Sequence, residues 1–252
     1  MSDPERRRFV LAGGLILNFG FGLTANLVAF QATPLRSLAL STDNWLSPTL
    51  VVNALAFCII VGGWLVAVGQ ESAASLGFRR SNLGIGIGIC AATWIAMQAI
   101  ATIGQVASGL PLSAIAPGFP GAMPVLLGQL AGNALYEETF YRGYLIRALT
   151  REVGGRNWAA VFLAAALFGV MHIPNYWVRG MSLGFLVPAT LAGILFGFLY
   201  LRTRNLWLCI GLHSLLNVPA TLWESPMPAY LAPTVVVFLC LGLGSRLRPR
   251  AE

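Results

Sequence analysis

The chain has 252 residues, of which 57% are hydrophobic and 10% are charged, and its formal net charge is +7. Soluble domains carry about 25% charged residues, so this composition excludes an ordinary soluble protein. All sixteen basic residues are arginine. No basic patch interleaved with aromatic residues accompanies them, so we expect no nucleic-acid binding. We attribute the positive charge to loops beside the anionic headgroups of a lipid bilayer.

Apolar runs of about 20 residues predict membrane-spanning helices, and eight such runs follow one another along the chain. No long polar stretch between them could form a second domain. We therefore predict an all-α, polytopic integral membrane protein with a single transmembrane helical domain over residues 1–252. The predicted spans are Phe9–Ala29, Leu46–Val68, Leu83–Ala107, Met123–Ile146, Trp158–Pro174, Leu183–Leu201, Leu206–Leu222 and Tyr230–Leu243.

The positions of the arginines predict the orientation of these spans. With a cytoplasmic amino terminus, thirteen arginines fall in inner segments, Arg36 and Arg179 fall in outer loops, and Arg142 lies within the fourth span. Cytoplasmic loops carry an excess of basic residues, so both termini are predicted to be cytoplasmic. Abundant Ala, Gly and Arg without lysine indicates a GC-rich prokaryotic genome. We therefore expect a multi-pass protein of the inner (cytoplasmic) membrane.

Three charged residues interrupt the fourth span, namely Glu137, Glu138 and Arg142. Each charge at the middle of a bilayer costs about 2.5–3.5 kcal/mol on insertion scales, so three in one span indicate a functional site. Glu138 and Arg142 are four residues apart on one helix face, and we predict that they form an ion pair. Glu137 lies about 140° from Arg142 around the helix, where Asn133 and Tyr141 share its face, and is left for another partner.

Both histidines of the chain also fall in apolar spans. His172 follows Phe168 by one turn at the end of the fifth span, and His213 precedes Asn217 by one turn in the seventh span. Either histidine alone could simply hydrogen-bond a neighbouring helix. Together with Glu137, they provide acidic, imidazole and amide groups on three spans that could converge at one intramembrane site.

These side chains fit two kinds of chemistry. A carboxylate and an imidazole can activate water while a second imidazole and an amide stabilise an oxyanion, as hydrolysis of a peptide bond requires. Alternatively, Glu137, His172 and His213 could ligate zinc as a His₂Glu site with an open position for water. The helical H-E-x-x-H motif of zincins is absent from the sequence.

The motifs Glu137-Glu138-x-x-x-Arg142, Phe168-x-x-x-His172 and His213-x-x-x-Asn217 resemble the CAAX protease and bacteriocin-processing (CPBP, or Abi) family. This family includes the type II CAAX prenyl endopeptidases, and the motifs lie within residues 123–223. The resemblance implies an eight-helix intramembrane protease of the glutamic type. It implies that Glu137 and His172 activate water, that His213 and Asn217 form the oxyanion hole, and that Glu138 and Arg142 support the site. No cofactor is expected, but the resemblance leaves a zinc requirement open.

The resemblance does not define the substrate, because family members cleave prenylated tails, process peptide precursors, confer bacteriocin immunity or assist sorting and secretion. Protein prenylation is not expected in a prokaryote, so we predict a peptide or membrane-protein precursor as substrate. The alternative is a non-catalytic membrane protein that uses the same polar cluster for binding or for bacteriocin immunity. A transporter is disfavoured because the sequence does not show two related halves with interrupted helices.

The depths of the candidate residues conflict on straight helices. At 1.5 Å per residue, Glu137 counted from Arg147 and Asn217 counted from Leu206 both lie about 15 Å from the predicted cytoplasmic ends. His172, counted from Asn157, lies about 22 Å deep. It would therefore miss the other residues by several ångströms, unless the fifth helix starts below the membrane surface or is strongly tilted.

Overall fold

The computed structural model describes residues 2–110, 118–178, 182, 184, 186–223, 228, 230–244 and 247, and these residues include helices and turns but no strand. In the labels used below, η1 is a 3₁₀ turn and η2, η3 and η4 are π-helical. The elements are α1 (Asp3–Leu27), η1 (Ala29–Gln31), α2 (Thr33–Ser41), α3 (Pro48–Ala56), η2 (Phe57–Val68), α4 (Arg80–Ala107), α5 (Phe119–Leu127), η3 (Gly128–Ala134), α6 (Leu135–Glu138), η4 (Thr139–Leu145), α7 (Ile146–Glu152), α8 (Asn157–Met171), α9 (Ile173–Val178), α10 (Leu186–Thr203), α11 (Leu206–Asn217) and α12 (Leu231–Leu243).

The prediction of an all-α membrane protein is confirmed. Within the described residues, four helical runs are long and apolar enough to cross a membrane: Asp3–Gln31, Pro48–Val68, Arg80–Ala107 and Leu186–Thr203. They coincide with the first, second, third and sixth predicted spans. The shorter apolar helices α8, α11 and α12 lie at the fifth, seventh and eighth predicted spans. The protein is therefore a multi-pass membrane protein.

One uninterrupted helix, here called the site helix, covers the fourth predicted span. It runs from Phe119 to Glu152 through α5, η3, α6, η4 and α7, and every junction between these segments has right-handed helical backbone angles. The site helix thus extends beyond both ends of the predicted Met123–Ile146. The π-helical segments η3 and η4 flank α6, which carries Glu137 and Glu138. Such segments are frequent at functional sites.

The seventh predicted span is wrong at its carboxyl end. It was expected to reach Leu222, but α11 ends at Asn217 and residues 218–222 are not helical. Pro219 explains the difference, because a proline disfavours helical angles at the residue before it. Val218 accordingly has φ −134° and ψ 87°. The end of α11 therefore places Asn217 at a helix terminus.

The fifth predicted span is interrupted rather than continuous. His172 ends α8, and α9 begins directly after it at Ile173. Pro174 lies in the first turn of α9, where the missing N–H of a proline is tolerated. The short helix α2 was not predicted, because its nine residues fall between two apolar runs.

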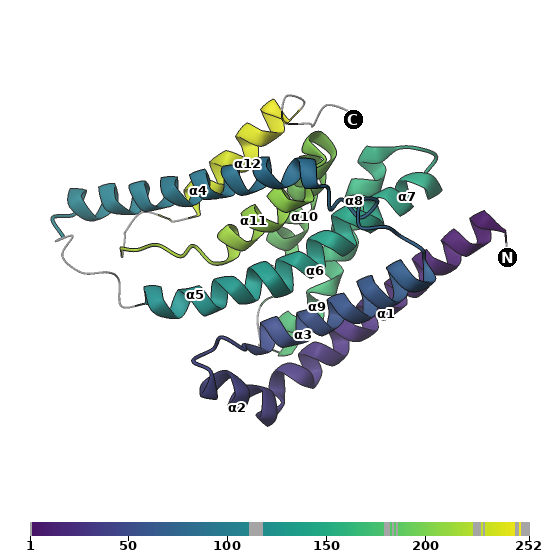
Figure 1. Cartoon of the computed structure of the whole chain (residues 1–252), viewed down its shortest axis with the longest axis horizontal. Helices are drawn as coiled ribbons and strands as arrows, with labels where there is room; N and C mark the ends of the chain where they lie inside the picture. Colours follow the sequence, from purple (N-terminus) through teal and green to yellow (C-terminus); the bar gives the residue numbers. More distant parts are fainter. Residues whose placement is uncertain are drawn as a thin grey trace.

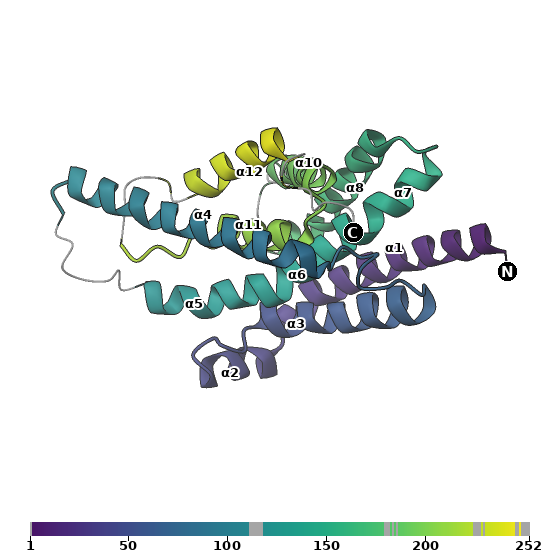
Figure 2. The same cartoon turned by 45° about the horizontal axis from the view of Figure 1, so that its top comes forward.

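The short helix α11 lies at the centre of the packing. It contacts α4, α10, α12 and the η3 and α6 segments of the site helix, and nine of its twelve residues are buried. Figure 1 and Figure 2 show α11 between α4 and α12 on one side and the site helix on the other. On the far side of the site helix, α1 packs against η2 and α3 packs against η3.

Close packing also fixes the loop before α4 against the site helix. A Cβ atom on Gly143 would lie 2.2 Å from the backbone oxygen of Leu76, a distance that no side chain can adopt. Leu76 is itself 1% exposed. Glycine at position 143 therefore permits this backbone to approach the site helix.

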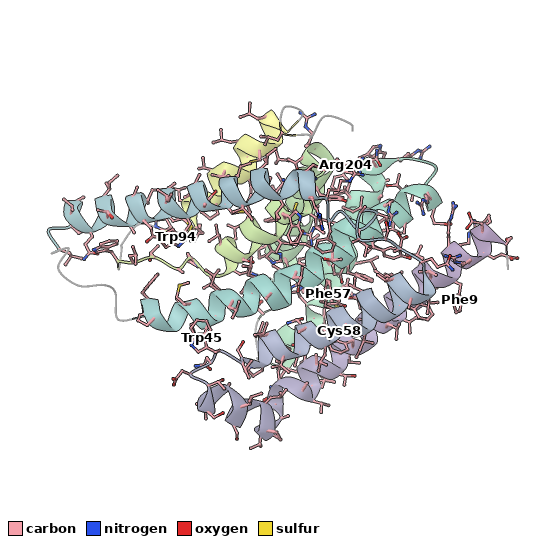
Figure 3. All side chains as sticks on the ribbon, viewed as in Figure 1. Phe9, Trp45, Phe57, Cys58, Trp94 and Arg204 are labelled. Atoms are coloured by element: carbon pink, nitrogen blue, oxygen red, sulfur yellow. The ribbon has the colours of Figure 1, made fainter. Side chains whose placement is uncertain are left out.

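The arginine-rich segments that the sequence assigns to one side of the membrane lie together at one end of the molecule. One cavity is lined by Arg6, Arg7, Arg8, Arg147 and Arg151. An adjoining cavity shares the last two of these and adds Arg79 and Arg204, and Figure 3 labels Arg204 at this end. Four of the five predicted inner segments therefore meet. The remaining one, with Arg246, Arg248 and Arg250, lies outside the described residues, as does Arg179.

Candidate active site

The site helix carries a fully buried ion pair. Nη1 of Arg142 lies 3.1 Å from Oε1 of Glu138, and the two side chains are 2% and 0% exposed. The pairing predicted from their spacing is confirmed. Because each charge is buried, its partner offsets a desolvation cost of several kcal/mol.

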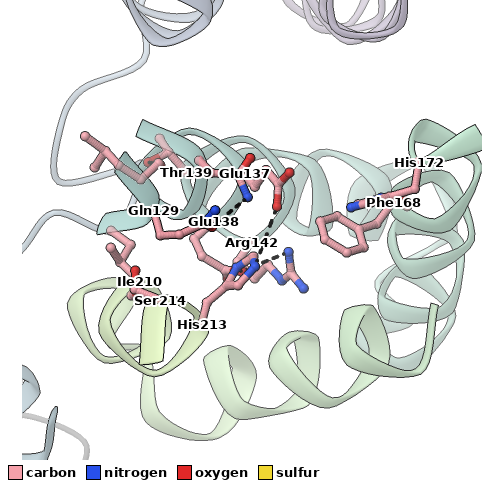
Figure 4. A network of polar contacts seen from close by, with 12 residues as sticks. Gln129, Glu137, Glu138, Thr139, Arg142, Phe168, His172, Ile210, His213 and Ser214 are labelled. Carbon is pink, nitrogen blue, oxygen red and sulfur yellow. Dashed lines mark hydrogen bonds and ion pairs between the residues drawn. The ribbon is translucent and has the colours of Figure 1, made fainter. Parts of the chain in front are cut away.

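His213 joins this pair from α11. Its Nδ1 lies 2.8 Å from Oε1 of Glu138, the oxygen that also faces Arg142. Its Nε2 lies 3.7 Å from Oε2 of Glu137. Figure 4 shows the His213 ring between the site helix and α10, with Arg142 beside it. The imidazole therefore bridges the two adjacent carboxylates of the motif.

This geometry defines where His213 carries hydrogen. An ionised carboxylate only accepts hydrogen bonds, so Nδ1 of His213 donates to Glu138. Nε2 is then unprotonated in the neutral ring and carries hydrogen only in the imidazolium form. Sequence spacing alone assigned Glu138 to Arg142, whereas the structure shows that Glu138 also orients His213.

Two phenylalanines enclose the Arg142 guanidinium. Its central carbon lies 4.8 Å from the ring centroid of Phe168 and 5.7 Å from that of Phe196. A guanidinium over an aromatic face is attracted by the ring, more strongly when it is desolvated. Phe168 also packs against His172, with ring centroids 4.7 Å apart and the ring planes tilted by 56°. The phenylalanine of the second motif thus connects the ion pair with His172.

His172 ends α8 with a ring whose tautomer is defined. Its Nδ1 lies 2.8 Å from the backbone oxygen of Phe168, and a carbonyl oxygen only accepts, so Nδ1 donates. The other ring nitrogen, Nε2, is then the basic one. Figure 4 shows His172 across the site from Glu137 and His213.

Asn217 is oriented by a residue that the sequence did not single out. Its Nδ2 donates to Oε1 of Gln129, on η3, at 3.0 Å. The same oxygen accepts a hydrogen bond from Nδ2 of Asn133 at 3.3 Å. Gln129 and Asn133 are four residues apart in an otherwise apolar run, and this polar spacing is the signal that could have identified Gln129.

The structure brings all four predicted catalytic residues to one cavity of about 250 Å³. Its lining includes Glu137, His172, His213 and Asn217, together with apolar side chains of α10. A second cavity of about 340 Å³ extends toward α1 and α3. Glu137, His172, Asn217 and Asn133 line both cavities and therefore lie where the two meet.

The conflict in depth disappears because the site helix ends later than predicted and because α11, which starts at Leu206 as predicted, is inset into the protein. The site helix continues to Glu152 rather than Arg147, so Glu137 and His172 both lie fifteen residues, or about 22 Å, from the α7–α8 turn. Gly154 and Gly155, with φ of 68° and 82°, form this tight turn.

The start of α11 is inset into the protein. Although α11 is a shorter helix, Asn217 at its end therefore lines the same cavity. Thr203 and Asn205, which precede α11, are 0% and 1% exposed. Asn205 donates to the backbone oxygen of Asn82, and Asn82 donates in return to that of Arg204. These hydrogen bonds fix the α10–α11 turn against the start of α4.

Asn18 of α1 is a second residue that the sequence did not reveal. It is fully buried, donates to the hydroxyl of Tyr141 at 2.9 Å and accepts a hydrogen bond from the hydroxyl of Tyr136. Asn18 and both tyrosines line the larger cavity. One amide in a long apolar helix is a weak signal, because it is equally typical of helix packing.

The described residues do not support the zinc alternative. Among them, no group of three His, Cys, Asp or Glu side chains is arranged to hold a metal ion. Glu137, His172 and His213 line one cavity but do not form such a group. His213 donates to Glu138 through Nδ1, and its Nε2 faces Glu137 at 3.7 Å.

Comparison with known families identifies the part of the chain that contains the site. The sequence model of the family described as "Type II CAAX prenyl endopeptidase Rce1-like" matches residues 119–219. This segment starts with the site helix, ends just after α11 and includes all seven residues of the three motifs. The resemblance predicted from the motifs is confirmed, and it indicates a membrane protease. Searches of curated proteins and of solved structures found no match.

Proposed function

We propose that this protein is an intramembrane endopeptidase of the glutamic type that hydrolyses a peptide bond in a membrane-associated peptide or protein precursor. The match of residues 119–219 to an endopeptidase family supports the reaction class. The observation that carries the proposal is the single cavity lined by Glu137, His172, His213 and Asn217, which come from the site helix, α8 and α11.

In the proposed reaction, Glu137 and His172 activate a water molecule. Oε2 of Glu137 is buried and accepts no hydrogen bond from a described residue. Buried carboxylate oxygens require a partner, and a water in the cavity supplies one. The water oxygen attacks the carbonyl carbon while its proton passes to Glu137 or to Nε2 of His172. That proton then goes to the leaving amine as the C–N bond breaks, which yields a carboxylate and an amine.

Asn217 and His213 are proposed to stabilise the tetrahedral oxyanion. Nδ2 of Asn217 has two hydrogens, of which one is donated to Gln129 and the other can reach the cavity. Nδ1 of His213 already donates to Glu138. Nε2 can therefore donate to the oxyanion only in the imidazolium form, in which both ring nitrogens carry hydrogen. Donors that are held in place before the reaction stabilise the developing negative charge without a cost of reorientation.

Glu138 and Arg142 are proposed to support the site rather than to react. Arg142 is held by Glu138 and two phenylalanine rings. Glu138 in turn orients His213. Both side chains are buried and therefore rigid, which keeps the His213 ring in one orientation during the reaction.

We further propose a single domain with eight spans and both termini in the cytoplasm of a prokaryotic cell, so that the protein lies in the inner membrane. Eight is the sum of the four long helices, the site helix and the three shorter apolar helices. The gathering of four arginine-rich segments at one end supports a common cytoplasmic side for these segments.

The test of the proposed function compares the membrane proteomes of cells that express wild-type protein, Glu137→Gln or Glu152→Gln, and searches for new peptide termini. Glu137→Gln removes the base and keeps the shape, so we expect termini that appear with wild type and Glu152→Gln but not with Glu137→Gln. Glu152 is the matched control because it lies at the carboxyl end of the site helix, fifteen residues after Glu137.

Two results would contradict the proposal. Full cleavage by Glu137→Gln would remove Glu137 from the mechanism. If the three proteomes are identical while folded Glu137→Gln still complements a null strain, the polar cluster binds a ligand without hydrolysis, as the immunity alternative requires.

A further inference from the structure

An arginine-lined cavity of about 490 Å³ lies away from the candidate active site, where α4, α7, α8 and α10 meet. Four arginines line it, and no Asp or Glu does: Arg79, Arg147, Arg151 and Arg204. These residues come from the turn before α4, from α7 and from the α10–α11 turn. Chain segments that are distant in sequence thus bring like charges together, which is unfavourable unless an anion joins them.

The charges of this cavity are largely unneutralised. Arg79, Arg151 and Arg204 form no ion pair with any described residue, and all three are exposed. Nη2 of Arg147 pairs with Glu71 at 2.7 Å, but Nε of Arg147 is buried without a hydrogen-bond partner among the described residues. A buried guanidinium N–H without a partner is costly, so this donor favours an acceptor inside the cavity.

The adjoining cavity at the same end of the molecule differs because carboxylates line it. It is also rich in arginine, but Asp3, Glu71 and Glu152 line it as well. Each of these carboxylates pairs with an arginine: Asp3 with Arg7, Glu71 with Arg147 and Glu152 with Arg8. Three of its five arginines are therefore neutralised by carboxylates of its own lining, whereas the lining of the 490 Å³ cavity contains four arginines and no carboxylate.

Uncharged donors add to the attraction for an anion. Tyr200 is 7% exposed, lines the cavity, and its hydroxyl forms no hydrogen bond with any described residue. Arg79 is the N-cap of α4, and Asn157 is the first residue of α8. Neither helix start is capped by a side chain. The free N–H groups and the positive dipole ends of these two helices favour an anion.

We propose that this cavity binds a phosphate group, either in the headgroup of an anionic phospholipid or as free phosphate. Guanidinium groups bind phosphate through parallel N–H···O bonds, and a phosphate offers more acceptor oxygens to several arginines than a carboxylate does. The cavity lies at the end of the molecule where the arginine-rich segments gather, beside which anionic headgroups are abundant. This inference does not depend on the proposed proteolytic function.

The test measures ligand binding by the full-length protein in a non-ionic detergent at constant ionic strength. The probes are short-chain phosphatidylglycerol, phosphatidylcholine of the same chain length, and inorganic phosphate. Native mass spectrometry counts bound ligand, and tryptophan fluorescence follows thermal unfolding. For the double variant Arg79→Gln/Arg204→Gln, we expect affinity for the bound probe to fall by about tenfold or more, since two charge-assisted contacts are lost.

Arg80→Gln is the matched control. Arg80 is the exposed neighbour of Arg79 at the same end of α4 but does not line the cavity. Arg151→Gln gives a second, independent variant if the double variant does not fold. Saturable binding of phosphatidylglycerol alone, weakened in the cavity variants and retained in Arg80→Gln, supports a headgroup site. The same pattern with inorganic phosphate supports a soluble phosphate.

The proposal is overturned if neither anionic probe binds saturably. It is also overturned if the cavity variants and Arg80→Gln change binding equally, because the attraction is then a general property of a basic membrane surface. The proposal is likewise overturned if phosphatidylcholine and phosphatidylglycerol bind equally and the variants have no effect.

Discussion

At the scale of single residues, the feature that distinguishes this protein is a chain of buried polar contacts from Arg142 through Glu138 to His213. Its three side chains are at most 10% exposed. The same oxygen of the Glu138 carboxylate contacts both Arg142 and His213, so this carboxylate has two functions. It neutralises a buried cation, and it determines which nitrogen of the histidine faces the cavity.

We therefore predict that Glu138→Gln and Arg142→Gln each destabilise the protein by about 3–5 kcal/mol, because either change leaves a buried charge without its partner. Chemical denaturation in detergent micelles measures the loss. Arg7→Gln is the control, since Arg7 pairs with Asp3 at the same spacing of four residues but both side chains are more than half exposed. We expect a change of at most about 1 kcal/mol there.

An equal, small change in all three variants would show that the Glu138–Arg142 pair is solvated. It would also remove the proposed reason for the fixed orientation of His213.

The two proposed oxyanion donors give a prediction about rate rather than stability. His213→Ala and Asn217→Ala should each lower kcat by about 10²–10³, the usual effect of losing one such donor. Cleavage of the substrate identified by the proteomic comparison gives the rates, and the yield of folded protein is measured alongside. A loss of folded protein with unchanged turnover per folded molecule would make these residues structural.

At the scale of helices, α1 is attached to the site helix by Asn18. We predict that Asn18→Leu destabilises the protein by about 1–3 kcal/mol for each tyrosine hydroxyl left buried and unsatisfied. The triple variant with Tyr136→Phe and Tyr141→Phe should recover most of this loss, because removing both partners of a buried hydrogen bond is nearly neutral. Thermal unfolding in detergent measures both effects.

Asn26→Leu is the control for this cycle. Among the described residues, the Asn26 amide donates only within its own helix, to the backbone oxygen of Gly22, so its removal should have a small effect. Failure of the triple variant to recover stability would show that Asn18 acts through its packing volume and not through its hydrogen bonds.

The sequence predicted the elements that depend on local pattern. Apolar runs located the helices, and a spacing of four residues identified the Glu138–Arg142 pair. Helix ends were less predictable, because they depend on packing. Asn217 ends α11 where a proline follows, and the site helix continues past Arg147 because α8 packs against α7.

The residues that the sequence did not reveal depend on contacts between distant segments. Gln129 became recognisable only when its oxygen was seen to accept from Asn217, 88 positions later. Asn18 lies 118 and 123 positions before its two tyrosine partners. Such an amide has no local signature, since its role comes from the helix that packs against it.

At the scale of the whole molecule, the loop after η2 is connected to the site helix by Glu71. Burial acts to raise the pKa of Glu71, but hydrogen bonds from Ser75 and Arg147 and the nearby positive charges outweigh it, and the pKa lies below its ordinary value. A carboxyl with a lowered pKa in the folded state stabilises the fold above its unfolded pKa of about 4.3. This contribution is lost as the pH falls through the folded-state pKa.

We accordingly predict that wild-type protein is more stable than Glu71→Gln at pH 7 and that the difference shrinks as the pH falls below the unfolded-state pKa of about 4.3. Thermal unfolding in detergent between pH 7 and pH 3 measures it. Glu152→Gln is the control, because Glu152 pairs with the largely exposed Arg8. A difference that is the same at every pH would show that the Glu71 charge does not contribute.

The contact between Asn18 and the two tyrosines also bears on how this architecture can change during evolution. The segment that matches the family begins at residue 119, yet the hydroxyls of Tyr136 and Tyr141 within it are satisfied from the first helix. The amino-terminal helices are therefore not interchangeable parts. A chimera that joins this segment to the leading helices of a relative would have two unsatisfied hydroxyls beside the candidate active site, unless the first helix of the relative also had an amide at the matching position.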